Sequence, residues 1–188
     1  MKNNTFFKEN IVPAVVLVII CLVVTAALAF THSVASPIIA ENEKQTADEA
    51  RAQVLPEGDG FTLYEGELAE GVTECYTADN GAGIAVTSTY GSFGGTLTSM
   101  VGIDKDGKIT GVTVTGHADT PGLGTKAMEA DYLAVNYDGL DTADAGSIKD
   151  DANVDAITGA TISSNAVYQC VKEALAQYEN IKGNVGLN

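Results

Sequence analysis

The residues best suited to chemistry lie in one short stretch near the C-terminus, from Asp155 to Ser164, which reads DAITGATISS. Its Thr161 offers a hydroxyl group directly after a turn of small residues, Thr158 to Ala160, and two serines follow. Beyond them, apolar side chains recur with the period of an amphipathic helix; these are Val167, Cys170, Val171, Ala174, Leu175 and Tyr178. We therefore expect a helix that begins close to Thr161.

The start of this helix is predicted to favour an anion. Ser163 or Ser164 is the expected N-cap, which places Thr161 just before the first turn. Backbone N–H groups there lack partners within the helix, and the positive end of the helix dipole attracts negative charge. A phosphate group suits this place. The alternative is an ordinary strand-turn-helix unit whose hydroxyl groups only cap the helix.

A second notable segment is the loop 116–124, which reads GHADTPGLG. Thr120, Pro121 and Gly122 are typical of a turn in which proline presets one φ angle and glycine takes a positive one. Leu123 stands between Gly122 and Gly124, so its side chain is suited to lying against a flat group. The loop is too apolar and too rich in glycine for a mere connector.

His117 and Asp119 in the same loop could form an acid/base pair, although an isolated histidine is more often structural. The sequence contains no serine-hydrolase, zinc-protease, P-loop or dinucleotide-binding motif. A third segment, Tyr90–Thr96 (YGSFGGT), holds the adjacent glycines Gly94 and Gly95, which permit unusual backbone conformations or the close approach of a ligand.

The elements expected around these segments give an α+β fold. Two hairpins form an antiparallel sheet, because Asp79-Asn80-Gly81 and Asp104-Lys105-Asp106-Gly107 are turn sequences between β-rich runs. The expected strands are Val72–Thr77, Ile84–Tyr90, Leu97–Ile103 and Ile109–Thr115, with Tyr90–Thr96 between the hairpins. Helices are predicted from Pro37 to Val54 and around Lys126–Leu133, and an apolar patch, Phe61–Tyr64, lies within a surface loop.

The N-terminal part predicts a membrane anchor. Residues Ile11–Phe30 are uncharged and apolar, and as a helix they would span about 30 Å, the thickness of a bilayer core. Lys2 and Lys8 precede this run, which places the N-terminus in the cytoplasm and the remainder outside. A cleaved signal peptide is the alternative, since Ala27-Leu28-Ala29 resembles a cleavage site, but the run exceeds the usual signal core.

Composition limits the function further. A net charge of −15 argues against nucleic-acid binding, which needs clustered Lys and Arg. The spacing of Cys21, Cys75 and Cys170 fits neither zinc nor an iron–sulfur cluster. Cys75 and Cys170 are either a disulfide or two buried free thiols, because Cys170 lies on the apolar face of the final helix.

Together these segments resemble a known family, the G subunit of the Rnf electron-transport complex. The chain is also similar to the C subunit of the sodium-pumping NADH:quinone oxidoreductase. The resemblance rests on the membrane span, on YGSFGG with the following VGIDKDGKITGV, on HADTPGLG and on DAITGATISS. It runs to the final helix, with only the linkers 40–71 and 134–152 uninformative. Relatives often have Ser where this chain has Thr158, and many have Glu in place of Asp119.

The resemblance implies that FMN is joined covalently to Thr161 through a phosphoester. A separate flavin transferase is then required, because a free hydroxyl group does not attack FAD unaided. Gly159 and Ala160 leave room for that enzyme to reach Thr161. The cofactor-binding residues that we expect are Thr161, Asp155, Thr158, Gly159, Ala160, Ser163, Ser164, Thr120, Pro121, Gly122, Leu123, Gly124, Gly94 and Gly95.

By the same resemblance the chain relays electrons within an ion-translocating oxidoreductase complex, without turning over a substrate of its own. Its expected partners are the other membrane subunits of the Rnf complex, which couples ferredoxin oxidation and NAD⁺ reduction to export of Na⁺ or H⁺. Three alternatives remain: the quinone-reductase C subunit, a stand-alone extracytoplasmic flavoprotein, and a non-redox surface-binding module.

The expected domain organisation has four parts. Residues 1–10 form a cytoplasmic N-terminus, 11–30 the transmembrane helix, 31–71 a juxtamembrane helix and linker, and 72–188 the covalent FMN-binding domain. The protein would thus be a single-pass protein of the plasma membrane, with its C-terminal domain on the extracytoplasmic side.

Overall fold

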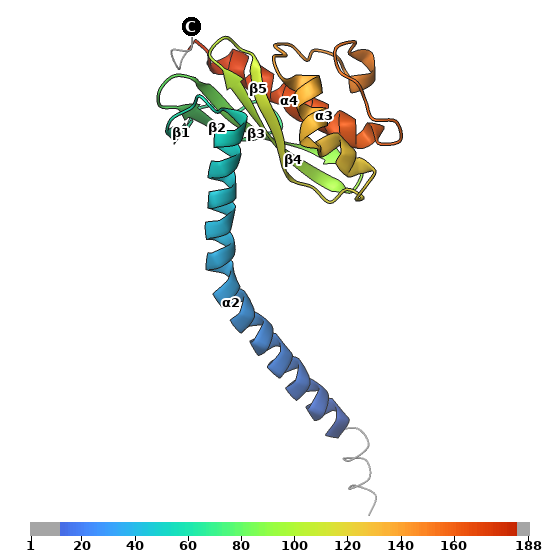
Figure 1. Cartoon of the computed structure of the whole chain (residues 1–188). Helices are drawn as coiled ribbons and strands as arrows, with labels where there is room; N and C mark the ends of the chain where they lie inside the picture. The colour runs from blue at the N-terminus through green and yellow to red at the C-terminus, as the bar shows by residue number, and fades with distance from the viewer. Residues whose placement is uncertain (1–11, 184–188) are drawn as a thin grey trace, which may run out of the picture. The chain divides into compact units, whose positions relative to one another are not determined.

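The structure is a computed structural model that describes residues 12–183. The chain divides into two compact units, Met1–Thr46 and Ala47–Asn188. The second unit begins earlier than the expected domain start at residue 72, because the end of the long N-terminal helix and a short strand belong to it. Figure 1 shows this unit as an antiparallel sheet with helices packed on it, which confirms the predicted α+β fold.

A single helix, α2, runs from Val12 to Val54. Its segment Pro13–Pro37 is long and apolar enough to cross a membrane, with a mean hydropathy of 2.9. The expectation of a second helix that starts at Pro37 is wrong, since Pro37 lies inside the continuous helix. Proline removes one backbone donor there, but the residues on either side continue the helix. The expected cytoplasmic residues 1–10, including Lys2 and Lys8, lie outside the described residues, as does Ile11.

The five-stranded sheet has its strands in sequence order, and every neighbouring pair is antiparallel. The strands are β1 (Phe61–Leu63), β2 (Val72–Ala78), β3 (Gly83–Ser92), β4 (Gly95–Asp104) and β5 (Ile109–Gly116). The four predicted strands are thus confirmed. The patch at Phe61–Tyr64, expected within a surface loop, is instead mostly the edge strand β1, since Phe61 pairs with Ala78.

The segment Tyr90–Thr96 does not separate two hairpins, as the sequence suggested, but closes a third. Tyr90 pairs with Leu97, and Ser92 pairs with Gly95, so only Phe93 and Gly94 form the turn between β3 and β4. Gly95 makes the tight reversal possible, because its φ of +137° is open to glycine alone. The three hairpins together make one continuous meander.

One face of the sheet carries the main core. Helix α4 (Thr161–Ile181) packs on β3 and β4, and helix α3 (Ala130–Tyr137) packs on β5. Cys75 and Cys170 are buried in this core as free thiols, the second of the two alternatives. Burial raises the pKa of both thiols to about 12, which keeps them protonated and unreactive.

The other face of the sheet receives the last turns of α2. Gly102 and Gly111 are paired across β4 and β5, and both lie against the backbone of Val54. A Cβ atom on Gly102 would stand 2.1 Å from the Val54 carbonyl oxygen. The hydroxyl group of Thr110 donates a hydrogen bond to that same oxygen. The glycine pair therefore forms a slot that anchors the end of α2.

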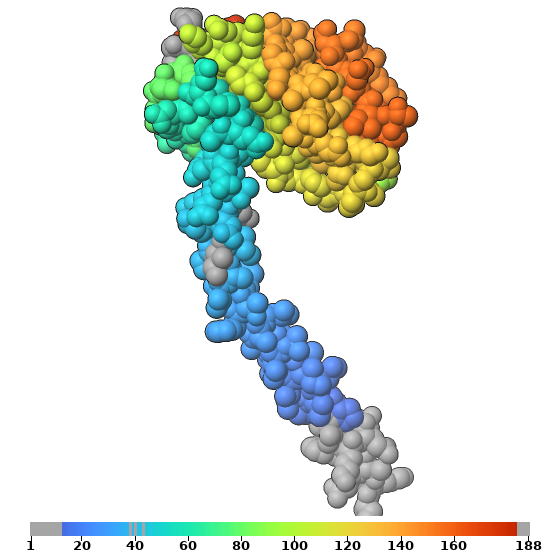
Figure 2. All heavy atoms as spheres, viewed as in Figure 1, coloured from blue at the N-terminus to red at the C-terminus, as the bar shows by residue number. Residues whose placement is uncertain are grey.

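The predicted helix at Lys126–Leu133 is divided in two. A 3₁₀ helix, η2 (Gly124–Met128), precedes α3, and Glu129 between them has an extended backbone with ψ of 138°. Figure 2 shows the segment after β5, in yellow, beside α3, in orange, on the surface of this unit. The acidic loop that follows contains one further 3₁₀ turn, η3 (Ile148–Asp150), whose Ile148 is buried in the core.

Candidate functional site

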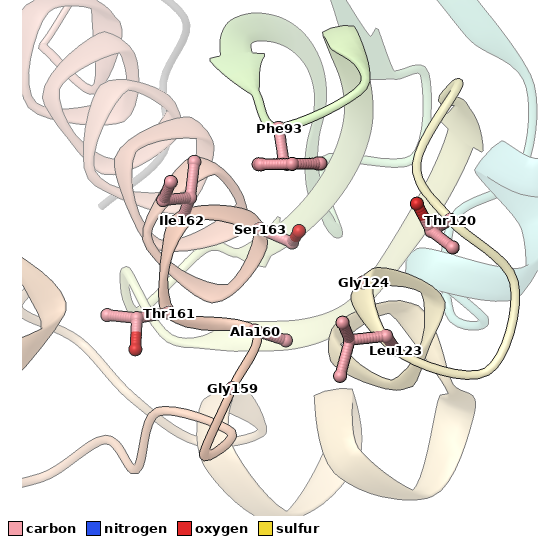
Figure 3. A pocket seen from close by; sticks show the side chains of 9 residues that line it. All are labelled: Phe93, Thr120, Leu123, Gly124, Gly159, Ala160, Thr161, Ile162 and Ser163. Carbon is pink, nitrogen blue, oxygen red and sulfur yellow. The ribbon is translucent and has the colours of Figure 1, made fainter.

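Three segments that are far apart in the sequence meet around one cavity of about 240 Å³. They are the turn between β3 and β4, the loop 116–124 and the start of α4. Figure 3 shows Phe93, Thr120, Leu123 and Ser163 around a common space, while the Thr161 side chain at its edge points away from them. The cavity is lined by Phe93, Thr120, Leu123, Gly124, Gly159, Ala160, Thr161, Ile162 and Ser163. Most of this lining is apolar, which suits an apolar or aromatic ligand.

The loop 116–124 adopts the predicted turn. Gly122 has a φ of +78°, and its N–H group donates to the hydroxyl of Thr125 at 2.9 Å. The turn directs Thr120 and Leu123 to the cavity, while Pro121 and Gly122 shape the backbone and do not line it. The Leu123 side chain is 48% exposed although it is large and apolar, so it presents an apolar surface to whatever enters the cavity.

Helix α4 begins at Thr161 itself, with Ala160 at the N-cap position, so the prediction of Ser163 or Ser164 as N-cap is wrong. The first helical hydrogen bond runs from the Ser164 N–H group to the Ala160 carbonyl at 2.9 Å. The N–H groups of residues 161–163 therefore have no acceptor one turn earlier in the helix. A turn at Gly159, with φ of +86°, leads the chain into this helix.

The hydroxyl groups around this helix start differ in their surroundings. Thr161 is partly exposed and lines the cavity. Ser163 also lines it but is buried, and Ser164 is fully buried, where its oxygen accepts from the Ile157 N–H group at 3.1 Å. Thr158 is exposed and does not line the cavity. Thr161 alone combines access from solvent, the first helical position and contact with the cavity.

Asp119 is a structural carboxylate and not half of an acid/base pair. It is only 4% exposed, and its oxygens accept hydrogen bonds from the Ser92 hydroxyl and the Gly94 N–H group. Burial acts to raise its pKa, but these two bonds, the Ser163 side chain and the charge of His117 together lower the pKa below its ordinary value. Asp119 is therefore ionised at neutral pH, and each of its two oxygens already accepts a hydrogen bond.

Asp155 contributes to the site through its backbone. The Tyr132 hydroxyl donates to its carbonyl at 2.7 Å, and its N–H group donates to Asn136 Oδ1 at 2.7 Å. These contacts join the DAITGATISS stretch to α3. The Asp155 residue is exposed and does not line the cavity, so the structure shows no contact of its carboxylate with the site.

The structure brings together seven of the fourteen residues expected at the site, namely Thr161, Gly159, Ala160, Ser163, Thr120, Leu123 and Gly124. The other seven, Asp155, Thr158, Ser164, Pro121, Gly122, Gly94 and Gly95, lie in the same segments without lining the cavity. Sequence reasoning missed Phe93 and Ile162, which are 72% and 56% exposed. Two sequence features could have indicated them. Phe93 is an aromatic residue among glycines in a turn, and Ile162 is an apolar residue outside the buried face of α4.

Within residues 12–183 no group of three or more His, Cys, Asp or Glu side chains could hold a metal ion. The donors at the cavity are instead hydroxyl groups and backbone N–H groups. Such a set fits a cofactor that has a phosphate at one end and a flat ring at the other, because the helix start suits the anion and the apolar wall suits the ring.

Comparison with known proteins agrees with this assignment. Residues 92–176, which contain all three cavity segments, match the FMN-binding domain family. The chain is 31% identical over 188 residues to the G subunit of the Na⁺-translocating ferredoxin:NAD⁺ oxidoreductase complex of Acetobacterium woodii, covering 88% of this chain and 90% of that protein. It is 28% identical over 174 residues to the G subunit of the proton-translocating ferredoxin:NAD⁺ oxidoreductase complex of Clostridium ljungdahlii, covering 89% and 90%.

Among solved structures, the crystal structure of Shewanella oneidensis NqrC aligns with a TM-score of 0.49 and 18% identity, covering 74% of each chain. The relatives of higher identity decide the family, since the aligned region takes in most of both chains. The resemblance noted in the sequence is thereby confirmed: the chain belongs to the G-subunit family of ion-translocating oxidoreductase complexes.

Proposed function

We propose that this chain relays electrons through one FMN that is joined covalently to Thr161 by a phosphoester. The observation that carries the proposal is the position of Thr161, the first residue of α4, which is partly exposed at the edge of an apolar cavity. None of the other three hydroxyl residues, Thr158, Ser163 and Ser164, combines exposure to solvent with a position at the cavity.

The start of α4 suits the phosphate. A phosphoester turns the phosphate of FMN, about −2 when free, into a diester with a single negative charge. The N–H groups of residues 161–163 can donate to its oxygens, and the helix dipole favours that charge. No acidic residue stands in the first turn of α4 to oppose it.

The cavity suits the ring system of the flavin. Its volume of about 240 Å³ is slightly below the roughly 300–1,000 Å³ typical of pockets that enclose a drug-sized ligand. A cavity of this size would enclose the flavin ring only in part, and the residues at the start of α4 would hold the phosphate. Leu123, Phe93 and Ile162 supply exposed apolar side chains for contact with the ring.

Attachment would use FAD as the donor. The Thr161 oxygen would bond to the phosphorus of the FMN half as the bond between that phosphorus and the bridging oxygen breaks, with AMP as the leaving group. The hydroxyl proton would pass to a base of a separate flavin transferase, since none of the residues that line the cavity is a histidine or carries a carboxylate. The transferase is the maturation partner that we infer.

The bound FMN supplies the redox chemistry, because its ring passes electrons singly or in pairs. The protein binds and orients the ring and limits its contact with water. With one cofactor and no metal cluster in residues 12–183, the chain must receive electrons from one partner and pass them to another. We infer that these partners are other subunits of an ion-translocating ferredoxin:NAD⁺ oxidoreductase complex. The names of two relatives describe those proteins as the G subunits of such complexes.

The test is a pair of variants of the full chain, each co-expressed with a flavin transferase. Thr161→Val keeps the β-branched shape and removes the hydroxyl, so we expect no covalent flavin by intact mass or by fluorescence in a denaturing gel. The control is Ser147→Ala, which removes a hydroxyl from the start of another helical turn and should retain the full adduct. An FMN adduct on the Thr161→Val protein would refute the attachment site. Absence of flavin from the unsubstituted chain would refute the covalent bond.

A further inference from the structure

Asp119 lies where the three walls of the cavity meet. Its carboxylate accepts hydrogen bonds from Ser92 and Gly94, the two residues on either side of Phe93. Gly124 of the cavity wall packs against it so closely that a Cβ atom there would lie 2.9 Å from both the Asp119 Cβ and the Ser163 Oγ. One carboxylate thus joins the β3–β4 turn, the loop 116–124 and the start of α4.

The turn that carries Phe93 is held at its backbone. Ser92 pairs with Gly95 across the turn, and Gly94 lies against the Ala118 backbone, where a Cβ atom would stand 2.1 Å from the carbonyl oxygen. The Phe93 side chain is itself 72% exposed, so packing within the protein contributes little to its position. Glycine-rich turns retain much conformational freedom. The two bonds to Asp119 therefore fix the turn, and with it the place of this ring, against the loop 116–124.

We propose that Asp119 is a positioning residue, whose carboxylate holds the Phe93 ring against the flavin ring in the cavity. The inference rests on the proposed function, because the flavin ring must lie in this cavity. Through Phe93 the carboxylate would exclude water from one face of the ring and restrict its motion. The Asp119 carboxylate acts in its ionised form, which accepts both bonds at once.

Asparagine replaces this carboxylate only in part, although it has the same shape. Its amide oxygen can accept from the Gly94 N–H group, and its NH₂ group can donate to the Ser92 hydroxyl oxygen, because a hydroxyl group also accepts. Both bonds then lack the charge of the carboxylate, and neutral hydrogen bonds contribute less than charged ones, so the population of the displaced turn should rise by up to roughly tenfold. Glutamate should restore part of the restraint, because it keeps the charge and both acceptor oxygens.

The experiment uses a tryptophan reporter at the turn. The chain contains no tryptophan, so Phe93→Trp gives a single indole reporter at the cavity. We compare Phe93→Trp alone with the same chain that also carries Asp119→Asn, both full-length and flavinylated. The control carries Phe93→Trp together with Asp79→Asn. Asp79 is another carboxylate beside a hairpin, and it accepts a hydrogen bond from the Thr62 hydroxyl at 2.7 Å.

In the flavinylated chain we expect Asp119→Asn to reduce quenching of the indole emission by the flavin and to change the visible circular dichroism of the flavin. Asp79→Asn should change neither. Asp119→Glu should recover part of the quenching, which a general loss of stability would not predict. Equal quenching and equal dichroism in the Asp119→Asn and Asp79→Asn proteins would overturn the proposal.

Two further measurements keep the test decisive. If Asp119→Asn does not fold, Ser92→Ala removes one of the two bonds and should give a smaller change in the same direction; unaltered signals would overturn the proposal. The anisotropy of the indole emission in the chain without flavin should also fall on Asp119 substitution. A fall in anisotropy in a chain that never acquires flavin would support the restraint while refuting the proposed cofactor attachment.

Discussion

Substituting Gly94 with alanine tests whether the β3–β4 turn is fixed against the loop 116–124. A Cβ atom on Gly94 would lie 2.1 Å from the Ala118 carbonyl oxygen, whereas ordinary contact begins at 3.4 Å. The difference, 3.4 − 2.1 = 1.3 Å, must be taken up by moving one backbone away from the other. Because both neighbours are backbone, no side-chain rotation can relieve the clash.

The cost follows from what that movement breaks. The hydrogen bond from the Gly94 N–H group to Asp119 ends in a charged acceptor, and such bonds contribute about 1.5–3 kcal/mol. Alanine offsets about 0.5–1 kcal/mol of this loss by reducing the freedom of the unfolded chain. We expect a net destabilisation of about 1–2 kcal/mol, which for a domain of this size lowers the melting temperature by roughly 3–10 °C.

Gly91 in the same hairpin provides the matched control. A Cβ atom at this position would meet no neighbour within 4 Å, and the residue has no positive φ, so Gly91→Ala should be neutral or slightly stabilising. The assay is thermal unfolding of both full-length variants, followed by circular dichroism, together with the visible spectrum of the flavin. Equal melting temperatures and equal flavin spectra for the two variants would refute the reasoning.

Three further outcomes are expected. Gly102→Ala should destabilise the chain by about 2–4 kcal/mol in thermal or denaturant unfolding, because it forces Val54 out of its buried place on the sheet; unchanged stability would show that α2 is not anchored there. The pKa of Asp119 is lower in the folded protein than its ordinary value of about 3.9. The ionised Asp119 therefore stabilises the fold above about pH 3.9, and this contribution is lost as the pH falls through the lower pKa of the folded protein. Asp119→Asn should therefore flatten the acid side of the stability curve, and a parallel curve would contradict the lowered pKa. Protease added to intact spheroplasts should digest residues 40–188 if this part of the chain is extracytoplasmic, and digestion only after lysis would reverse the orientation.

The sequence was sufficient for the elements whose pattern is local and strong. Alternation of apolar residues with turn sequences at Asn80-Gly81 and Asp106-Gly107 located the sheet strands to within a few residues. The apolar run near the N-terminus indicated a membrane anchor for a similar reason, since length and hydropathy suffice. The resemblance to the flavoprotein family could be stated because each segment that carries it, DAITGATISS among them, is contiguous in the sequence.

The errors arose at the boundaries of helices. Ser164 has a side chain that is typical of an N-cap, but its oxygen accepts a hydrogen bond from the Ile157 N–H group. Helix α4 starts three residues before Ser164. Pro37 is typical of a helix start, yet α2 continues through it. The division between η2 and α3 at Glu129 also has no sequence signal. At Ser164 a hydrogen bond outside the helix outweighed local capping preference, whereas Pro37 is exposed and the helix simply continues through it.

Only the tertiary structure decided which side chains share the cavity. Phe93, Leu123 and Thr161 come from three segments of the sequence, and no local pattern states that a turn, a loop and a helix start converge. Asp119 shows this most clearly: its sequence context suggested a partner for His117, whereas folding placed it between Ser92 and Gly94. The sequence determined the chemistry that each segment could offer, and long-range packing determined which groups face one another, because a contact between distant segments depends on the whole path of the chain.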